Sequence, residues 1–359
     1  MNGRQDGNHF AKKFPELGTG PISADSYRNP AFFEREKDAI FRRTWQFAGR
    51  VEQIPEPGDF FLRSVPAFDL SLIFVRGSDG KVRGFHNACR HRGNHVCLEE
   101  QGSCRAFTCK FHGWIYNLEG ELVSVHDEGG LANADKKKLG LVPVSTDVWE
   151  GFIFFNLESA PALSLAQYLG ELGERLQGFP FHEYSTHFRY AAVIKANWKT
   201  VIDAFSEVYH LPSLHKLSLS TSLGGPENPF CHLLEADAFG PHRMFSVWGN
   251  KKYRPHPVQG IAYEFAGGGS IIGGAGERED LPIGVNPTRS DNWGLDANIF
   301  FPNVLPMISA GMFITHQMWP ISVDSTQWEL SGYLRPAETA AQRFTQEYFK
   351  VELRDALLE

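Results

Sequence analysis

The feature that most constrains this chain is a pair of short loops, each of which carries one cysteine and one histidine. One residue separates Cys89 from His91, two residues separate Cys109 from His112, and seventeen residues lie between the loops. A glycine follows closely behind each histidine. Glycine lets the backbone turn sharply and bring N–H groups toward the sulfurs. The loops therefore predict one metal centre with two thiolate and two imidazole ligands.

Two kinds of metal centre use these ligands. A Rieske [2Fe–2S] cluster takes two thiolates on one iron and two imidazoles on the other, which raises its reduction potential. Tetrahedral zinc also accepts two cysteines and two histidines. Here the ligands alternate in type, and segments 84–88, 106–108 and 111–116 have strand-like sequences. This context favours the Rieske cluster over zinc. The predicted cluster ligands are Cys89, His91, Cys109 and His112.

The remaining cysteines do not suggest a disulfide framework. The chain has five cysteines, an odd number, and its first fifteen residues lack the apolar core of a signal peptide. Cys97 and Cys104 lie between the two loops. They could be spare ligands or a disulfide, but we interpret them as small buried thiols.

Composition excludes several classes of protein. The net charge is −7, whereas a general nucleic-acid binder is basic, so we expect no nucleic-acid partner. No apolar run reaches the length of a membrane span, so we expect no membrane association. Together with the absence of a targeting pattern, this predicts a cytoplasmic protein.

A second candidate metal site follows about 95 residues after the cluster loops. Apolar residues recur at three- and four-residue steps in segment 197–210, which predicts a helix with Glu207 and His210 on one face. Pro212 is expected to break this helix, so that His215 returns to the same metal. Two imidazoles and one carboxylate form the facial triad of non-haem Fe(II) oxygenases, which leaves positions open for O2 and substrate. Alone, such a motif is usually a polar helix face; beside a Rieske motif, it indicates iron.

From about residue 25 to its end, the chain resembles the catalytic α-subunit of a Rieske non-haem iron aromatic ring-hydroxylating oxygenase. The matching segments are 89–93, 109–114, 197–199 and 207–215. The resemblance implies an α+β fold, with a β-rich Rieske domain and a helix-grip catalytic domain in which an antiparallel sheet surrounds a long helix. The expected divisions are an N-terminal segment at 1–40 that packs on the catalytic domain, the Rieske domain at 41–160 and the mononuclear-iron domain at 161–359.

The resemblance also implies roles for the residues of the second site. His210 and His215 would bind the mononuclear Fe(II). Glu207 would not be a ligand but an electron bridge between His112 of one subunit and His210 of the next. Most members have Asp at this position, whereas choline- and carnitine-type relatives have Glu. Asp203 stands where many members have Asn, which makes it a candidate catalytic residue, as a weak extra ligand or a proton relay; the alternative is a structural salt bridge.

The third iron ligand is not assigned. The family takes a carboxylate from a C-terminal helix. Asp355 is the candidate within the chain, Glu359 is a poorer one because terminal residues are rarely ordered, and a residue beyond Glu359 is the remaining alternative.

The implied function is that of an oxygenase component. It would use O2 and NAD(P)H electrons, delivered by a flavin reductase and/or a ferredoxin, to mono- or dioxygenate a hydrophobic, aromatic small molecule. One alternative is an N- or O-demethylating or quaternary-ammonium monooxygenase, and a remoter one is a Rieske electron carrier without chemistry of its own. An apolar pocket would be drawn from aromatic and apolar residues of the C-terminal half. These candidates are Phe205, Phe245, Trp248, Phe300, Phe301, Met307, Phe313, Ile314 and Trp328.

Surface features complete the expectations. The bridge role of Glu207 implies a homotrimer, with or without small β-subunits. Arg90, Arg92 and Lys110 are better docking candidates for an electron donor than the lysine run 136–138, because they lie closer to the cluster. The glycine-rich segment 266–276 lacks the pattern of a phosphate loop, so we interpret it as a mobile loop over the active-site mouth.

Overall fold

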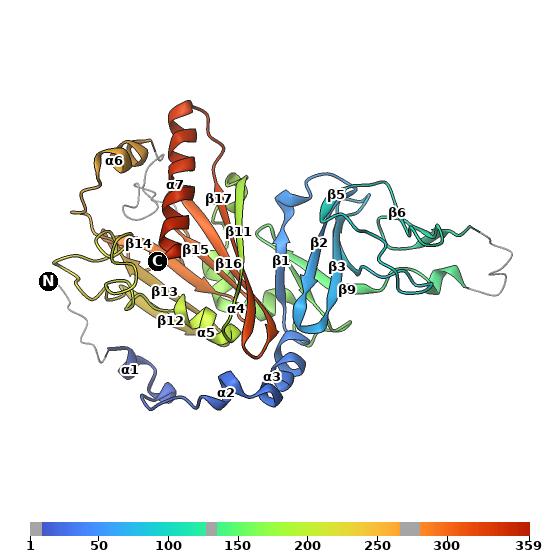
Figure 1. The fold of residues 1–359 in the computed structure, drawn as a ribbon, viewed down its shortest axis with the longest axis horizontal. Helices are drawn as coiled ribbons and strands as arrows, with labels where there is room; N and C mark the ends of the chain where they lie inside the picture. Colours follow the sequence, from blue (N-terminus) through green and yellow to red (C-terminus); the bar gives the residue numbers. More distant parts are fainter. Residues whose placement is uncertain (1–8, 127–134, 266–280) are drawn as a thin grey trace.

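The computed structural model describes residues 9–126, 135–265 and 281–359, which form two β-rich regions side by side (Figure 1). The N-terminal region contains a seven-stranded antiparallel sheet. Its aromatic and branched residues form a dense core on both faces of the sheet. In spatial order the strands are β1 (Gln46–Arg50), β10 (Phe152–Asn156), β9 (Pro143–Trp149), β4 (Val82–His86), β3 (Leu70–Arg76), β2 (Asp59–Val65) and β5 (Gln101–Ser103).

A small three-stranded sheet extends from the outer end of this region (Figure 1). It consists of β6 (Phe107–Thr108), β7 (Ile115–Tyr116) and β8 (Leu122–Ser124). The strand-like sequences at 84–88 and 106–108 correspond to β4 and β6. The expectation for 111–116 is wrong in its first half, because residues 111–114 form a tight turn in which the Gly113 N–H donates to the Cys109 carbonyl (2.9 Å).

The C-terminal region contains a second seven-stranded antiparallel sheet. One face packs against α4 (Leu165–Leu176) and against the first sheet, and the other packs against α5 (Trp198–Ala204) and α7 (Ala340–Leu358). This is the expected antiparallel sheet with a long helix across it (Figure 1). In spatial order the strands are β11 (Thr186–Ile194), β17 (Ser325–Leu334), β16 (Met312–Ser322), β15 (Val304–Ile308), β14 (Trp293–Ile299), β13 (His242–Trp248) and β12 (Glu235–Phe239).

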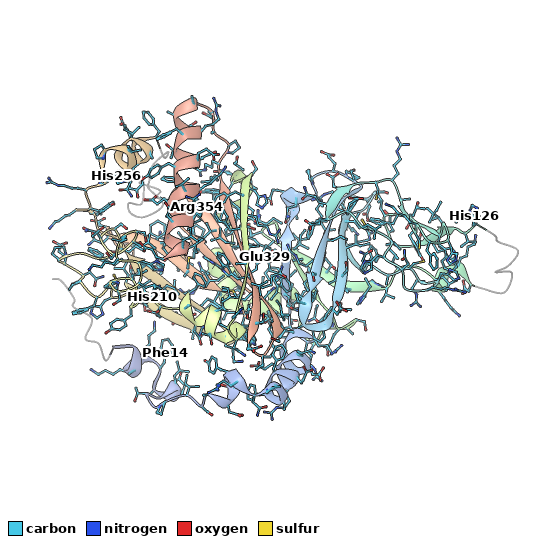
Figure 2. The ribbon with its side chains drawn as sticks, in the orientation of Figure 1. Phe14, His126, His210, His256, Glu329 and Arg354 are labelled. Atoms are coloured by element: carbon cyan, nitrogen blue, oxygen red, sulfur yellow. The ribbon has the colours of Figure 1, made fainter. Side chains whose placement is uncertain are left out.

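Buried polar contacts join the two regions. Arg63 on β2 lies 2.9 Å from Glu329 on β17, whose carboxylate is almost fully buried. Figure 2 shows Glu329 between the two regions. The backbone N–H of Phe47 on β1 donates to the Asn303 side chain (3.0 Å), just before β15. These contacts hold the cluster-bearing region in a defined orientation against the catalytic sheet.

The N-terminal segment runs beneath the second sheet in the view of Figure 1. It contains α1 (His9–Lys13), α2 (Asp25–Arg28) and α3 (Pro30–Glu36), and a π-helical turn at Lys37–Phe41 continues α3. Asn29 caps α3 by accepting a hydrogen bond from the Ala31 N–H. A further helix, α6 (Pro257–Glu264), packs against α7. None of the helices within the described ranges is long and apolar enough to cross a membrane.

Candidate metal centres

The two cluster loops have the same backbone design. In each, the cysteine N–H donates to the carbonyl five residues later (2.8 Å), and the following glycine N–H donates back to the cysteine carbonyl (2.8 and 2.9 Å). Gly93 and Gly113 have φ values of 74° and 67°, in the left-handed region that glycine adopts without strain. Two loops of one geometry therefore face each other at the outer end of the first region.

The four predicted ligands lie in two pairs. The Nδ1 atoms of His91 and His112 are 3.1 Å apart, and both imidazoles are exposed. Cys89 and Cys109 are buried inside them, with 3% and 2% of their surface exposed. The Trp114 ring stacks on His91 with a centroid distance of 4.9 Å. An inner pair of thiols and an outer pair of imidazoles is the arrangement that a cluster with two ligands per iron requires.

Neighbouring groups stabilise the sulfurs. The Tyr116 hydroxyl lies 3.2 Å from Cys89 Sγ and accepts from the Arg90 N–H (3.0 Å). Burial opposes ionisation of Cys109, but the backbone N–H groups of Phe111 and His112 outweigh it and hold the pKa of this thiol below its ordinary value. Burial instead raises the pKa of Cys89, which the Tyr116 hydrogen bond only partly offsets.

The donor set fits a [2Fe–2S] cluster better than zinc. Within the ranges that the structure describes, no three His, Cys, Asp or Glu side chains converge as ligands of one ion. A single zinc ion would need all four donors around one point, whereas each iron of a Rieske cluster takes only two protein ligands.

The second site begins with a correction to the predicted helix. Segment 197–210 is not one helix: α5 ends at Ala204, and residues 205–215 form a series of turns. Ser206 ends the helix, because its hydroxyl donates to the Ile202 carbonyl (2.6 Å) and its N–H to the Asp203 carbonyl (2.9 Å). Pro212 is therefore not the residue that breaks the helix. The apolar pattern predicted too long a helix because Val208 and Leu211 remain buried after the helix has ended.

The turns nevertheless bring Glu207 and His210 together. Glu207 Oε1 lies 2.5 Å from His210 Nδ1, and Oε2 accepts from the backbone N–H groups of Tyr209 and His210, the latter at 3.2 Å. A carboxylate on one ring nitrogen fixes the tautomer and orientation of a ligating histidine, and leaves Nε2 for the metal. The His210 and His215 rings lie edge to face, with centroids 5.3 Å apart.

A second carboxylate beside the two histidines, after that of Glu207, belongs to Glu359. Its Oε2 lies 3.4 Å from His215 Nδ1 and accepts from the Ser218 hydroxyl (2.7 Å). Asp355 instead pairs with Arg354 (2.8 Å) and is largely exposed. Of these two candidates, Glu359 lies beside His215, but it does not complete a three-ligand set in the described part of the chain, so the third ligand stays unassigned. Burial, followed by the nearby His210, lowers the pKa of His215, which favours the neutral, metal-binding imidazole.

The Asp203 carboxylate forms a salt bridge and a hydrogen bond. Its Oδ2 accepts from the Tyr27 hydroxyl (3.0 Å), and its Oδ1 from the Arg243 guanidinium (3.3 Å). Of the three roles expected for Asp203, this geometry supports the structural salt bridge.

The predicted pocket residues divide between different layers. One group lies in the core that contains the Glu207–His215 turns, on the α5 and α7 face of the sheet. Phe300 and Phe313 lie on the opposite face, and Phe301 packs against Trp198. The glycine-rich segment 266–276 lies outside the described residues. The residues on the site face are Phe205, Phe245, Met307, Ile314 and Trp328.

Sequence reasoning missed His316 on β16. Its ring packs against Phe205 with a centroid distance of 4.1 Å, and its Nδ1 accepts from Trp328 Nε1 (3.1 Å). Complete burial lowers its pKa to about 3, so the imidazole is neutral. The available signal was a single histidine within the mostly apolar segment 312–320.

The two candidate centres lie at opposite ends of the molecule. Figure 2 shows His126, which neighbours Gly113 of the second cluster loop, far from His210 at the other end. The basic residues Arg90, Arg92 and Lys110 are exposed at the cluster end. The lysine run forms a 3-10 turn at Lys136–Lys138, in which Asp135 caps the Lys137 N–H.

Comparison with known proteins identifies both regions. Residues 44–135 match the family model "Rieske [2Fe-2S] domain", and residues 181–357 match "Ring hydroxylating alpha subunit (catalytic domain)". The chain is 32% identical to the oxygenase subunit of glycine betaine monooxygenase from Pseudomonas aeruginosa (strain UCBPP-PA14) over 198 residues, which cover 55% of this chain and 45% of the relative. It is 33% identical to the α-subunit of biphenyl 2,3-dioxygenase from Rhodococcus jostii (strain RHA1) over 206 residues, 56% of this chain and 44% of the relative.

A solved structure shares the whole fold. The quaternary ammonium Rieske monooxygenase CntA superimposes with a TM-score of 0.70 at 19% identity, covering 92% of this chain and 81% of the other. The chain spans less than half the length of the glycine betaine monooxygenase and biphenyl 2,3-dioxygenase relatives. The two matched models together account for most of the chain and for both predicted metal centres. The chain therefore belongs to the catalytic α-subunit family of the Rieske non-haem iron ring-hydroxylating oxygenases.

Proposed function

We propose that the protein is the oxygenase component of a multi-protein enzyme that uses O2 and NAD(P)H electrons from a flavin reductase, with or without a ferredoxin. The observation that carries this proposal is the coexistence of the paired Cys/His loops with the Glu207–His210–His215 turns in one chain of this family. When bound, the cluster would deliver electrons and the mononuclear iron would activate O2. The chain's own residues orient the ligands: Glu207 fixes the His210 ring, and Tyr116 contacts Cys89.

We further propose a quaternary ammonium substrate instead of a flat aromatic one. The support is the similarity to glycine betaine monooxygenase and the presence of Glu207 where most ring hydroxylases have Asp. On the site face of the sheet, the Phe205 and Trp328 rings are parallel, with centroids 6.3 Å apart. Aromatic faces attract cations without a full counter-charge. Neutral His316, which contacts both rings, adds no repelling positive charge.

The second candidate is an aromatic hydrocarbon. The similarity to the biphenyl 2,3-dioxygenase α-subunit favours it, as does the apolar character of the layer beneath the site. Either substrate would bind among the apolar residues on the α5 and α7 face of the second sheet, so the charge of the substrate is the property that separates the two proposals.

Electron transfer is proposed to run between subunits. His126, which neighbours the second cluster loop, and His210, which contacts Glu207, lie at opposite ends of the molecule (Figure 2), so a direct path needs a neighbouring copy. Large apolar side chains are exposed at both ends: Leu98 and Phe111 near the cluster, and Tyr209 and Leu217 near Glu207. Exposed apolar groups of this size are typical of interaction surfaces. Two different surfaces that meet head to tail close into a ring, here a trimer. Inter-subunit electron transfer is described for a quaternary ammonium Rieske monooxygenase.

A matched substrate pair tests the proposal. Glycine betaine and its carbon isostere, 3,3-dimethylbutanoate, have similar shapes and share the carboxylate, but the isostere has a neutral carbon in place of the cationic nitrogen. With a reconstituted reductase, we expect O2 uptake coupled to oxidation of the ammonium compound and little oxidation of the isostere. Oxidation of biphenyl, but of neither member of the pair, would favour the second candidate. NADH-dependent cluster reduction without oxidation of any compound, in protein that lacks mononuclear iron, would indicate an electron carrier.

A further inference from the structure

The N-terminal segment contacts α5 at both ends of the helix. At the start of α5, Glu36 accepts hydrogen bonds from Trp198 Nε1 (3.2 Å) and Lys199 Nζ (2.6 Å), and the Glu36 carboxylate is almost fully buried. At the end of α5, the Tyr27 hydroxyl donates to Asp203 Oδ2 (3.0 Å). The helix that precedes Glu207 is therefore held from outside by residues about 170 positions earlier in the chain.

A continuous set of contacts leads from Tyr27 to the residue next to Glu207. Asp203 Oδ1 accepts from an Arg243 nitrogen (3.3 Å), and the same nitrogen donates to Ser206 Oγ (2.9 Å). Ser206 Oγ in turn donates to the Ile202 carbonyl (2.6 Å), the contact that ends α5. Because Ser206 directly precedes Glu207, these bonds determine where the chain leaves the helix.

The position of Glu207 depends on this exit. Its carboxylate is about half exposed and is held by contacts within its own turn, to the backbone N–H groups of Tyr209 and His210 and to the His210 ring. The described contacts tie the turn to the rest of the protein through Ser206 and Arg243 on one side and through buried Val208 on the other. A small shift of the turn would move the carboxylate and the His210 ring together.

We infer that Tyr27 and Asp203 are positioning residues, which act through Arg243 and Ser206 to hold the Glu207 carboxylate where it can meet a cluster histidine of a neighbouring subunit. The effect on electron transfer rests on the proposed function, whereas the effect on the position of Glu207 does not. The Tyr27–Asp203–Arg243 contacts lie near the surface, and exposed pairs of this kind contribute little to stability. Their effect is therefore expected on geometry and not on folding.

The test is the variant Tyr27→Phe, and Tyr253→Phe is the matched control. Among the described residues, the Tyr253 hydroxyl forms a hydrogen bond only with Gln259, which lies in α6. The first readout is hydrogen exchange of the backbone amides at 206–210 in the purified full-length protein. We expect exchange to become about tenfold faster in Tyr27→Phe and to stay unchanged in Tyr253→Phe. Arg243→Lys, whose side chain is one atom shorter and so withdraws the nitrogen shared by Asp203 and Ser206, should have the same effect. This readout does not require turnover, so it remains decisive if the proposed function fails.

The second readout is the rate of cluster oxidation during a single turnover of pre-reduced protein. Tyr27→Phe should slow it by about three- to tenfold, with iron content and reduction of the cluster by dithionite unchanged. In a Glu207→Gln background, Tyr27→Phe should add no further loss, because both changes act on one group. Unchanged exchange at 206–210 in both Tyr27→Phe and Arg243→Lys would overturn the inference, as would a full additional loss in the Glu207→Gln background.

Discussion

Oε1 of Glu207 lies 2.5 Å from Nδ1 of His210, although both residues lie in turns beyond the end of α5. Oε2 is occupied by backbone N–H groups of the same turn. The carboxylate is still about half exposed, so it can contact a further group from outside the chain. One side chain thus orients a candidate iron ligand and, in the proposed assembly, would present its carboxylate to a neighbouring subunit.

Glu207→Gln should preserve both metal centres and abolish most turnover. The amide oxygen can still accept from His210, but the neutral side chain no longer serves as an acceptor for two imidazoles at once. Loss of a group that orients a ligand typically costs about 10- to 100-fold in activity. Steady-state turnover and iron analysis on the same sample measure the effect, and Glu207→Asp, which retains the charge, is the control. Coupled turnover at the wild-type rate in Glu207→Gln would rule out the bridge.

Charge reversal beside the cluster should slow electron entry. Arg90 and Lys110 are exposed within the two cluster loops. Lys110→Glu should lower the rate of reduction by the physiological donor by about tenfold at low salt, and the difference should shrink at high salt. Lys137→Glu, in the lysine run, is the matched control and should change the rate little. A larger effect at Lys137 than at Lys110 would place the donor on the lysine run.

The Arg63–Glu329 pair should couple the two regions in a pH-dependent way. Burial opposes ionisation of Glu329, but the charges of Arg63 and Arg189 outweigh it and hold its pKa below the ordinary value. A lowered pKa stabilises the fold above the unfolded-state pKa of about 4.3, and this stabilisation is lost as the pH falls below it. Glu329→Gln should therefore reduce the free energy of unfolding by about 3 kcal/mol at pH 7 and by less near pH 4. Urea unfolding at both pH values measures this, and an equal loss at both would contradict it.

Asp296 should produce the opposite pH dependence. Complete burial raises its pKa to about 7, although Ser246 and the Asn286 N–H donate to it. Because the unfolded chain releases this proton near pH 4, the contribution of Asp296 to stability should fall by about 1.4 kcal/mol per pH unit between pH 5 and 6.5. Asp296→Asn keeps an acceptor for the Asn286 N–H and should remove this slope. Unfolding curves of both proteins across this range check it; a difference that does not vary with pH would contradict the buried ionisation.

Local spacing predicted the cluster loops, because the determinants are short: a cysteine, a histidine and a glycine within five residues. The strand-like sequences beside the loops also predicted β4 and β6. The end of α5 was not predictable in the same way. Val208 and Leu211 continue the apolar period beyond Ala204, and the hydroxyl of Ser206, which ends the helix, has no effect on that period.

Contacts between distant segments could not be predicted from the sequence either. The approach of Glu359 to His215 and of Tyr27 to Asp203 depends on how α7 and the N-terminal segment pack on the second sheet. His316 was missed because a single histidine on an apolar strand has no distinguishing spacing. The family resemblance identified His210 and His215 without showing which local structure would bring them together.

The measurement that tests the central claim most directly is iron, zinc and acid-labile sulfide per chain in protein expressed from its full reading frame and purified anaerobically. A Rieske cluster together with a mononuclear site predicts about three irons, about two sulfides and no stoichiometric zinc. His210→Ala combined with His215→Ala should lower the iron to about two and leave the sulfide unchanged. Stoichiometric zinc without sulfide, or two irons that the double variant does not reduce, would contradict the presence of both an electron-entry cluster and an oxygen-activating iron in this chain.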